Sequence, residues 1–356
     1  MNLDLGAELA LGNLTSPPVL AFIFGVIVVA VLRSDLRFPA KIAQFLSVYL
    51  LLAIGIKGGV ALRDAHIGDV IAPALAAIAL GCLIPVAAFG ALRWLTRLSP
   101  LDRGALAAHY GSTSLVTFTA ALAILEVVKI PFEGYVATLL TIMEIPGIIV
   151  GLLLATRAAA RSASPAPARM LVGSGGSEIE PDPGTHDGLA TPSRTDWSHT
   201  LREVITGPSV LLLVGGLLIG VITGPVGYAS VEPLFSDLFK GVLTLYLLHL
   251  GCIAGERLRD VRAAGPGLIV FALAFPVIAG TAGVIAGTVT GMSVGGAAVL
   301  GVLCASASYI AAPAAVSLAL PKANTGLCLT ASLGITFPFN LIIGIPLLVA
   351  IAQALA

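Results

Sequence analysis

The chain has 356 residues, of which 57% are hydrophobic and only 11% are charged, and its mean hydropathy is +1.02. A soluble globular protein carries about 25% charged residues, so most of this chain must face lipid or other helices. The 19 lysines and arginines equal the 19 aspartates and glutamates, and no net charge therefore favours nucleic acid as a partner. The composition excludes a soluble enzyme. The four cysteines lie in apolar runs without CxxC spacing, so we expect neither disulfides nor a resident metal or cofactor.

Long apolar runs predict membrane-spanning helices, because lipid offers no partners for unpaired backbone N–H and C=O groups. Ten such runs follow one another along the chain. They lie at about 17–33, 39–57, 69–93, 104–125, 131–156, 206–223, 238–255, 267–290, 296–320 and 327–352. We therefore expect an all-α polytopic membrane protein.

One polar stretch separates the first five runs from the last five. Residues 157–203 are rich in Ser, Pro, Gly and Asp and include the segment GSGGSEIEPDPGTHDG. Such a composition cannot bury enough apolar surface to fold alone. We interpret it as a disordered cytoplasmic linker between a first membrane repeat, residues 1–156, and a second, residues 204–356.

The charges of the loops predict the orientation in the membrane. Loops 33–37, 93–103 and 256–262 are net positive, and Arg157 and Arg161 follow the fifth run. All of these lie on one side, which is then cytoplasmic. Both termini are expected outside.

Two halves of five spans each indicate an inverted repeat, since an odd number of spans reverses the direction of a duplicated unit. Residues 51–64 (LLAIGIKGGVALRD) and 247–260 (LLHLGCIAGERLRD) share the pattern LLxxGxxxGxxLRD. We expect the Gly-rich runs to serve close helix packing: Gly55, Gly58, Gly59, Gly291, Gly295 and Gly296. The run Pro17-x-Val19-Leu20 also recurs as Pro208-x-Val210-Leu211.

Polar stretches interrupt the fourth and ninth spans, which are partners in the repeat. The fourth carries Ser112, Thr113, Ser114 and Thr117, and the ninth carries Ser306, Ser308 and Tyr309. Broken helices at the middle of the membrane expose N–H groups and the positive end of a half-helix, which favour an anion. These seven residues are the candidate substrate site, although serines and threonines also serve as packing residues in membrane helices.

Glu144 is the one charged residue in the middle of a span, and such residues are candidates for function by default. It could ligate a cation, carry a proton or form a buried structural pair. Thr336 occupies the corresponding place in the tenth span, and Asn340 follows it. We predict cation binding or coupling for these three residues, with helix-to-helix bonding as the alternative for Asn340. His109, beside the fourth-span break, is a possible relay or a packed core residue.

The sequence contains no Walker motif, no HExxH and no convincing nucleophile–base constellation, so we do not expect an enzyme. Transport driven by an ion gradient remains.

Three segments resemble the sodium-dependent bicarbonate transporter family: AAHYGSTSLVTFTAALAILE, KIPFEGYVATLLTIMEIPGIIVGLLLA and ASASYIAAPAA. The resemblance implies a sodium/bicarbonate symporter of the bacterial inner (plasma) membrane, built from two inverted five-helix repeats and assembled as a homotrimer. It implies that the anion lies between the broken fourth and ninth spans, with a transported sodium ion nearby as co-substrate. A PII-like regulator docks on the cytoplasmic face of cyanobacterial members, and one is a possible partner here.

The chain departs from the cyanobacterial pattern in its ninth span, where Tyr309 and Ala311 replace an acidic residue and a serine. Symport of another small monocarboxylate or anion, coupled to sodium or protons, is therefore the alternative. A lesser alternative is a non-transporting sensor or scaffold whose output is the linker.

Overall fold

The computed structural model describes residues 15–356 except 163–201, 203–204 and 262–263. Within this part of the chain the secondary structure is helical, without strands. Most of the expected linker lies outside the described residues. Its first six residues are the end of a helix that continues through Ser162.

The described residues form the following elements. The first half contains α2 (Pro17–Ala30), α3 (Ala40–Asp64), α4 (Ile67–Leu95), α5 (Pro100–Gly111), α6 (Leu115–Val127) and α7 (Val136–Ser162). The second half contains α9 (Pro208–Ala229), the π-helical turn η1 (Pro233–Asp237), α10 (Phe239–Val261), α11 (Pro266–Val289), α12 (Val294–Ala305) and α13 (Ala311–Ala319). The last span is assembled from α14 (Thr325–Leu329), η2 (Thr330–Thr336), α15 (Phe337–Phe339), η3 (Asn340–Gly344) and α16 (Ile345–Leu355).

All ten predicted spans fall on helices, but within the described residues eight helical stretches are long and apolar enough to cross a membrane. The first predicted span, α2, has 14 residues. At ~1.5 Å per residue such a helix is shorter than the hydrocarbon core of about 30 Å. The ninth is divided into α12 and α13, with 12 and 9 residues. A multi-pass membrane protein is established, and the count of ten remains a prediction.

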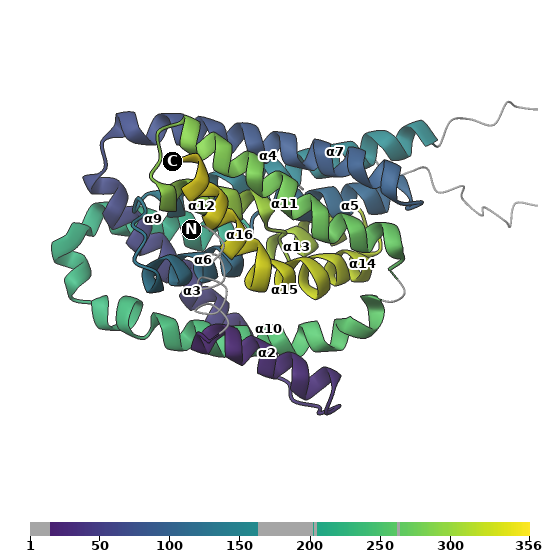
Figure 1. Ribbon diagram of the computed structural model, residues 1–356, viewed down its shortest axis with the longest axis horizontal. Coiled ribbons are helices and arrows are strands. Elements are labelled where there is room, and N and C mark those ends of the chain that lie inside the picture. The colour runs from purple at the N-terminus through teal and green to yellow at the C-terminus, as the bar shows by residue number, and fades with distance from the viewer. Residues whose placement is uncertain (1–14, 163–201, 203–204, 262–263) are drawn as a thin grey trace, which may run out of the picture.

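The helices form two groups. Helices α2, α3, α9 and α10, the four-helix group, pack as the close pairs α3–α9 and α2–α10, and the latter pair lies along the lower edge in Figure 1. Helices α4 to α7 and α11 to α16, the core group, pack chiefly through α5 on α7 and α12 on α11. The two broken helices run through the middle of the core group (Figure 1). The groups meet mainly where α10 contacts η2 and α3 contacts α7.

The glycines of the repeated motif lie at the contacts within the four-helix group. A Cβ atom on Gly55 or Gly59 would collide with the backbone of α9, and one on Gly251 would collide with the Phe22 carbonyl of α2. In lipid, where apolar side chains gain little from leaving the solvent, such close backbone approach is a main source of helix association. Of the glycines expected to serve packing, Gly55, Gly58, Gly59, Gly295 and Gly296 lie at close contacts. The expectation is wrong for Gly291, where a Cβ would meet nothing and φ is 81°.

The arginine of the same motif stabilises a bend in α9. Gly224 has φ of 60° there, and Pro225 has no N–H to donate to the Val221 carbonyl four residues earlier. The guanidinium of Arg63 donates to the carbonyls of Val221 and Ile222, at 3.4 and 3.2 Å. A side chain from α3 therefore replaces the hydrogen bonds that the bend removes.

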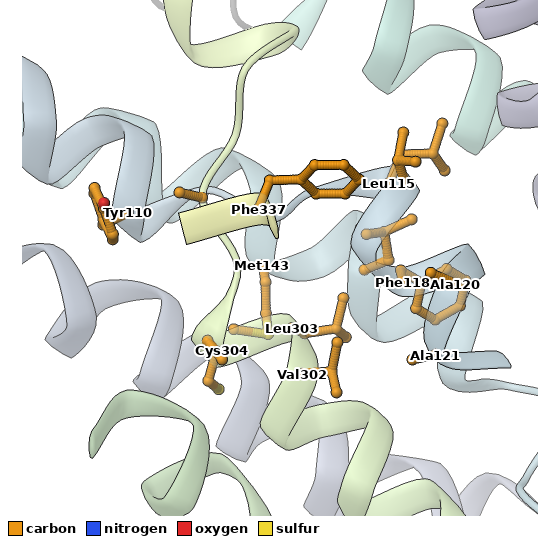
Figure 2. Close-up of a cluster of buried hydrophobic side chains, with 14 of the residues drawn as sticks. Tyr110, Leu115, Phe118, Ala120, Ala121, Met143, Val302, Leu303, Cys304 and Phe337 are labelled. Carbon is orange, nitrogen blue, oxygen red and sulfur yellow. The ribbon is translucent and has the colours of Figure 1, made fainter. Parts of the chain in front are cut away.

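Apolar side chains surround the breaks and hold them in place. Figure 2 shows Leu115 and Phe118 of α6 gathered with Val302 and Leu303 of α12 and with Phe337 from the last span. Each of these side chains is buried. The broken helices are thus embedded in a dry, close-packed core, which fixes the polar groups of the breaks.

The glycine contacts lead to a prediction on stability. A Cβ on Gly220 of α9 would meet the Ile56 carbonyl, whereas one on Gly215 of the same helix would meet nothing. Gly220→Ala should destabilise the purified protein by about 1–3 kcal/mol through overpacking. Thermal unfolding in detergent measures the change. Gly215→Ala controls for helix propensity and should leave the melting temperature unchanged or raised; an equal response of both variants would contradict this packing.

Candidate functional site

The fourth and ninth spans are each broken, as predicted. Helix α5 ends at Gly111 and α6 begins at Leu115, while α12 ends at Ala305 and α13 begins at Ala311. The serine side chains stabilise the breaks locally. Ser114 caps α6, because its Oγ accepts from the N–H of Thr117 at 3.2 Å and from the hydroxyl of Thr117 at 2.9 Å. The Oγ of Ser308 likewise accepts from the N–H of Ala312, at 3.2 Å.

The two breaks bond to each other. The N–H of Ser114 donates to Oγ of Ser306 at 2.9 Å, and the N–H of Ser308 donates to the carbonyl of His109 at 2.7 Å. The Ser306 hydroxyl donates in turn to the Leu303 carbonyl, at 2.8 Å. Backbone groups that the breaks release are thereby paired across the two halves of the chain.

A small cavity lies beside the breaks, between the core group and the four-helix group. It offers about 20 Å³ to the centre of a water molecule, enough for one small ion or a water. Five of the predicted site residues line it: Thr113, Ser114, Glu144, Ser308 and Tyr309. The four-helix group contributes Leu51 of α3 with Ser209 and Leu213 of α9.

Two backbone donors face this cavity from the starts of the half-helices. The N–H groups of Leu115 and Ala311 have no acceptor within the described ranges, and both residues line the cavity. They are the first residues of α6 and α13, where the helix dipole is positive. The Ser114 hydroxyl accepts two bonds and keeps its own hydrogen for a further acceptor. Groups with positive partial charge therefore line the cavity, as predicted for a site that favours an anion.

The carboxyl group of Glu144 lines the same cavity from the middle of α7. The residue is 5% exposed and forms no hydrogen bond or ion pair in the described part of the protein. The adjacent sequence explains its position. A Cβ on Gly147 would collide with the Gly111 carbonyl, so this glycine lets α7 approach the first break directly. Glu144, one turn earlier, then faces the cavity beside that break.

The other predicted residues lie outside the cavity lining. Ser112, Thr117 and Ser306 are buried within the breaks. Thr336 accepts from or donates to the Tyr110 hydroxyl at 2.6 Å and donates to the Ala272 carbonyl at 2.7 Å; because its one hydrogen serves Ala272, Tyr110 must be the donor. Its hydroxyl is thus fully engaged in helix-to-helix bonding.

Asn340 and His109 each use one side-chain group and leave another unpaired. Asn340 donates to the carbonyl of Ala305, the last residue of α12, at 2.8 Å, while its Oδ1 has no partner among the described residues. His109 Nδ1 lies 2.8 Å from the Ala105 carbonyl, and its Nε2 is buried without a partner there. Coupling by Asn340 and a relay through His109 stay predictions.

Sequence reasoning missed Ser209. It stands two residues after a glycine at the start of an apolar helix and matches no site motif. The repeat offered one signal. Ser209 aligns with Pro18 within two otherwise similar segments, so the second segment has a polar residue where the first has proline.

No group of three or more His, Cys, Asp or Glu side chains that could hold a metal ion occurs in the ranges that the structure describes. Comparison with known families gives one match: residues 17–353 fit the Na+-dependent bicarbonate transporter superfamily. The chain belongs to this superfamily. No curated protein matches the sequence. The match covers both broken spans, α7 and the four-helix group, and the resemblance identified from the sequence is confirmed.

In this member of the superfamily, carboxylates hold the starts of both broken helices. Ser293 caps α12, and its N–H and hydroxyl donate to Glu133 at 2.5 and 3.0 Å. At the start of α5, Asp102 accepts from the hydroxyl of the capping residue Ser99 at 2.7 Å and from the N–H of Asn324 at 2.8 Å. Negative charge at a helix N-terminus is stabilising. Each contact joins a broken helix of one half to a loop of the other.

These caps give a second prediction. Glu133→Gln keeps the shape of the side chain but removes its charge, and should lower the free energy of unfolding by about 0.5–2 kcal/mol. Thermal unfolding of the purified transporter measures the loss. Glu232→Gln, at an exposed carboxylate, is the control. A melting temperature that falls no further for Glu133→Gln than for the control would mean that the cap is not stabilising.

Proposed function

We propose that the protein is a secondary active transporter that carries bicarbonate into the cell together with sodium by alternating access. The observation that carries this proposal is the cavity at the two breaks. Two unpaired N–H groups at helix starts and several hydroxyls face the same small space as a buried, unpaired carboxyl group. Donors for an anion and a carboxylate for a cation therefore line one space, which must widen beyond the room for a single small ion to hold both, in a member of the Na+-dependent bicarbonate transporter superfamily.

The anion is held by donors from both broken helices. The N–H groups of Leu115 and Ala311 supply two hydrogen bonds, and the hydroxyls of Ser114 and Ser308 supply further ones. A carboxylate-like anion with three oxygens fits this donor-rich arrangement. Thr113 and Tyr309 complete the lining. The hydroxyl of Tyr309 lies on the side of Ser114 but forms no hydrogen bond of normal geometry, so it can turn toward a bound anion.

Glu144 supplies the negative ligand for sodium. Hard cations prefer oxygen ligands, and carboxylates are the strongest of these. A single buried charge without a partner costs several kcal/mol, so binding of one ion stabilises the other. Coupling between the sodium ion and the anion follows from this mutual neutralisation.

Movement of the two groups against each other would give alternating access. In the predicted repeat, α2 corresponds to α9 and α3 corresponds to α10. The close pair α3–α9 therefore corresponds to the other close pair, α2–α10. This agreement supports two inverted five-helix repeats. The core group, whose broken helices are bonded together, is the natural carrier of the ions. The inner-membrane location, outside termini, homotrimer and PII-like regulator rest on the loop charges and on the family resemblance.

A different small monoanion is the second candidate. Tyr309 and Ala311 stand where the cyanobacterial pattern has an acidic residue and a serine, and both line the cavity. A phenol and a methyl group make the cavity less polar, which favours a small monocarboxylate.

Uptake of labelled bicarbonate into proteoliposomes at alkaline pH tests the proposal. Uptake should require an inward sodium gradient, and Glu144→Gln should reduce it about 10–100-fold, as expected when a hydrogen-bonded charged ligand is lost. Asp35→Asn, at an exposed loop carboxylate, should leave uptake unchanged.

Sodium-independent uptake, or full activity of Glu144→Gln, would refute the coupling. If bicarbonate is not transported while formate or acetate is, the second candidate replaces the first. Competition of each anion against labelled bicarbonate separates the two substrates in a protein that accepts both.

A further inference from the structure

A second cavity adjoins the central one at the end of the molecule where α3 and α9 begin. It offers about 410 Å³ to the centre of a water molecule. It shares four lining residues with the central cavity: Leu51, Ser209, Ile310 and Ala311. We call it the linker-side cavity, because α9 is the first long helix after the segment 163–201. An ion that leaves the breaks toward this side must pass these four residues.

The linker-side cavity has no charged residue in its lining. Its polar side chains are Gln44, Ser47, Ser209 and Tyr246, and the remainder of the lining is apolar or backbone. An anion in such surroundings needs hydrogen-bond donors, because burial of an unpaired charge is costly.

The start of α9 presents donors at this place. Gly207 caps the helix and Pro208 is its first residue, so Ser209 and Val210 carry the first backbone N–H groups. Neither N–H has an acceptor in the described part of the chain, since the first helical hydrogen bond runs from Leu211 to Gly207. The two residues are only 9% and 5% exposed. Buried, unpaired N–H groups are rare in proteins and call for a partner.

The side chain of Ser209 adds an independent observation. Its hydroxyl forms no hydrogen bond with any described residue, although the residue is more than nine-tenths buried, and it lines both cavities. The Ser209 oxygen is not among the buried unpaired atoms, so it is open to the cavity and can bond to an occupant. Ser209 thus lies at the passage between the two cavities, and the N–H-bearing residue Val210 lines the linker-side cavity beside it.

We infer that Ser209 and the first turn of α9 form an oxyanion subsite in the four-helix group, which receives the transported anion from the breaks on its way to the linker side. The inference rests on the proposed function, because it assigns this subsite to the anion bound at the breaks. It adds a contact from the four-helix group to a site otherwise built by the core group.

The start of α2, the repeat partner of α9, differs at this place. In the repeat, Thr206-Gly207-Pro208-Ser209 aligns with Thr15-Ser16-Pro17-Pro18, and proline has neither an N–H nor a hydroxyl. The cavity at the start of α2 offers about 80 Å³ and shares no lining residue with the central cavity. The repeat therefore does not duplicate the Ser209 hydroxyl at the start of α2, where Ser16 and Lys240 line the cavity instead.

Exchange of labelled bicarbonate at equilibrium across proteoliposomes tests the subsite. Ser209→Ala should raise the half-saturating bicarbonate concentration about tenfold, the effect of losing a hydrogen bond to a charged group. Ser209→Pro, which copies the sequence at the start of α2, should raise it further. Ser209→Thr keeps the hydroxyl and should stay near wild type. At saturating bicarbonate, the half-saturating sodium concentration should change in none of them, which a general structural defect would not allow.

Thiol labelling gives a readout that does not depend on bicarbonate transport. Ser209→Cys and the control Gln44→Cys, elsewhere in the same cavity, are treated with anionic and cationic methanethiosulfonate reagents of similar size. The ratio of the anionic to the cationic rate should be higher for Ser209→Cys, and nitrate or formate should slow its labelling.

The two measurements separate the possible failures. If the wild type exchanges no bicarbonate but labelling favours the anionic reagent at Ser209→Cys, the proposed substrate fails and the subsite stands. Equal ratios for both thiol variants, or unchanged half-saturation in both Ser209→Ala and Ser209→Pro, would overturn the subsite.

Discussion

The hydrogen bonds between the two breaks are the interaction on which the rest of this structure depends. A bilayer contains no water to pair with free backbone groups, so an interrupted helix is tolerated only where protein replaces the lost bonds. Here Ser306 receives the N–H of Ser114, and the His109 carbonyl receives the N–H of Ser308. Each break leaves one N–H group unpaired beside the cavity, that of Leu115 in the first break and that of Ala311 in the second. The pairing that membrane solvation requires thus also leaves the donors of the cavity to which we assign the anion.

Neighbouring helices contact the breaks closely where a glycine at the contact has no side chain. Gly147 brings α7 onto the first break. Carboxylates join each broken helix to the other half: Glu133 accepts from Ser293 at the start of α12, and Asp102 of α5 accepts from Asn324. The four-helix group uses the same device of glycine contacts but carries no break in α3 or α10. The breaks and most of the cavity lining thus belong to the core group. Among the described residues of the four-helix group, the start of α9 brings Ser209 to the same cavity.

Much of this could be predicted from the sequence, for reasons that are physical. Glu144 and the serine-rich interruptions are costly in lipid, so their presence in apolar spans already indicated function. The repeated glycines were visible because close backbone contact tolerates no substitute. Ser209 could not be identified, because one serine near a helix start is common and its importance lies in two N–H groups that the sequence does not display. The bend at Gly224 and the π-helical turns η2 and η3 were also missed, since hydropathy reports that a segment is apolar and not how its backbone is wound.

The bonds between the breaks also set an order for biogenesis. Ser114 and its acceptor Ser306 are 192 residues apart in the chain. At a synthesis rate of about 5–20 residues per second, the first broken helix is made roughly 10–40 seconds before its partner exists. During that interval its interrupted backbone must be shielded by the insertion machinery or stay close to the membrane surface. The first half of the protein is therefore expected to complete its insertion only when the second half arrives.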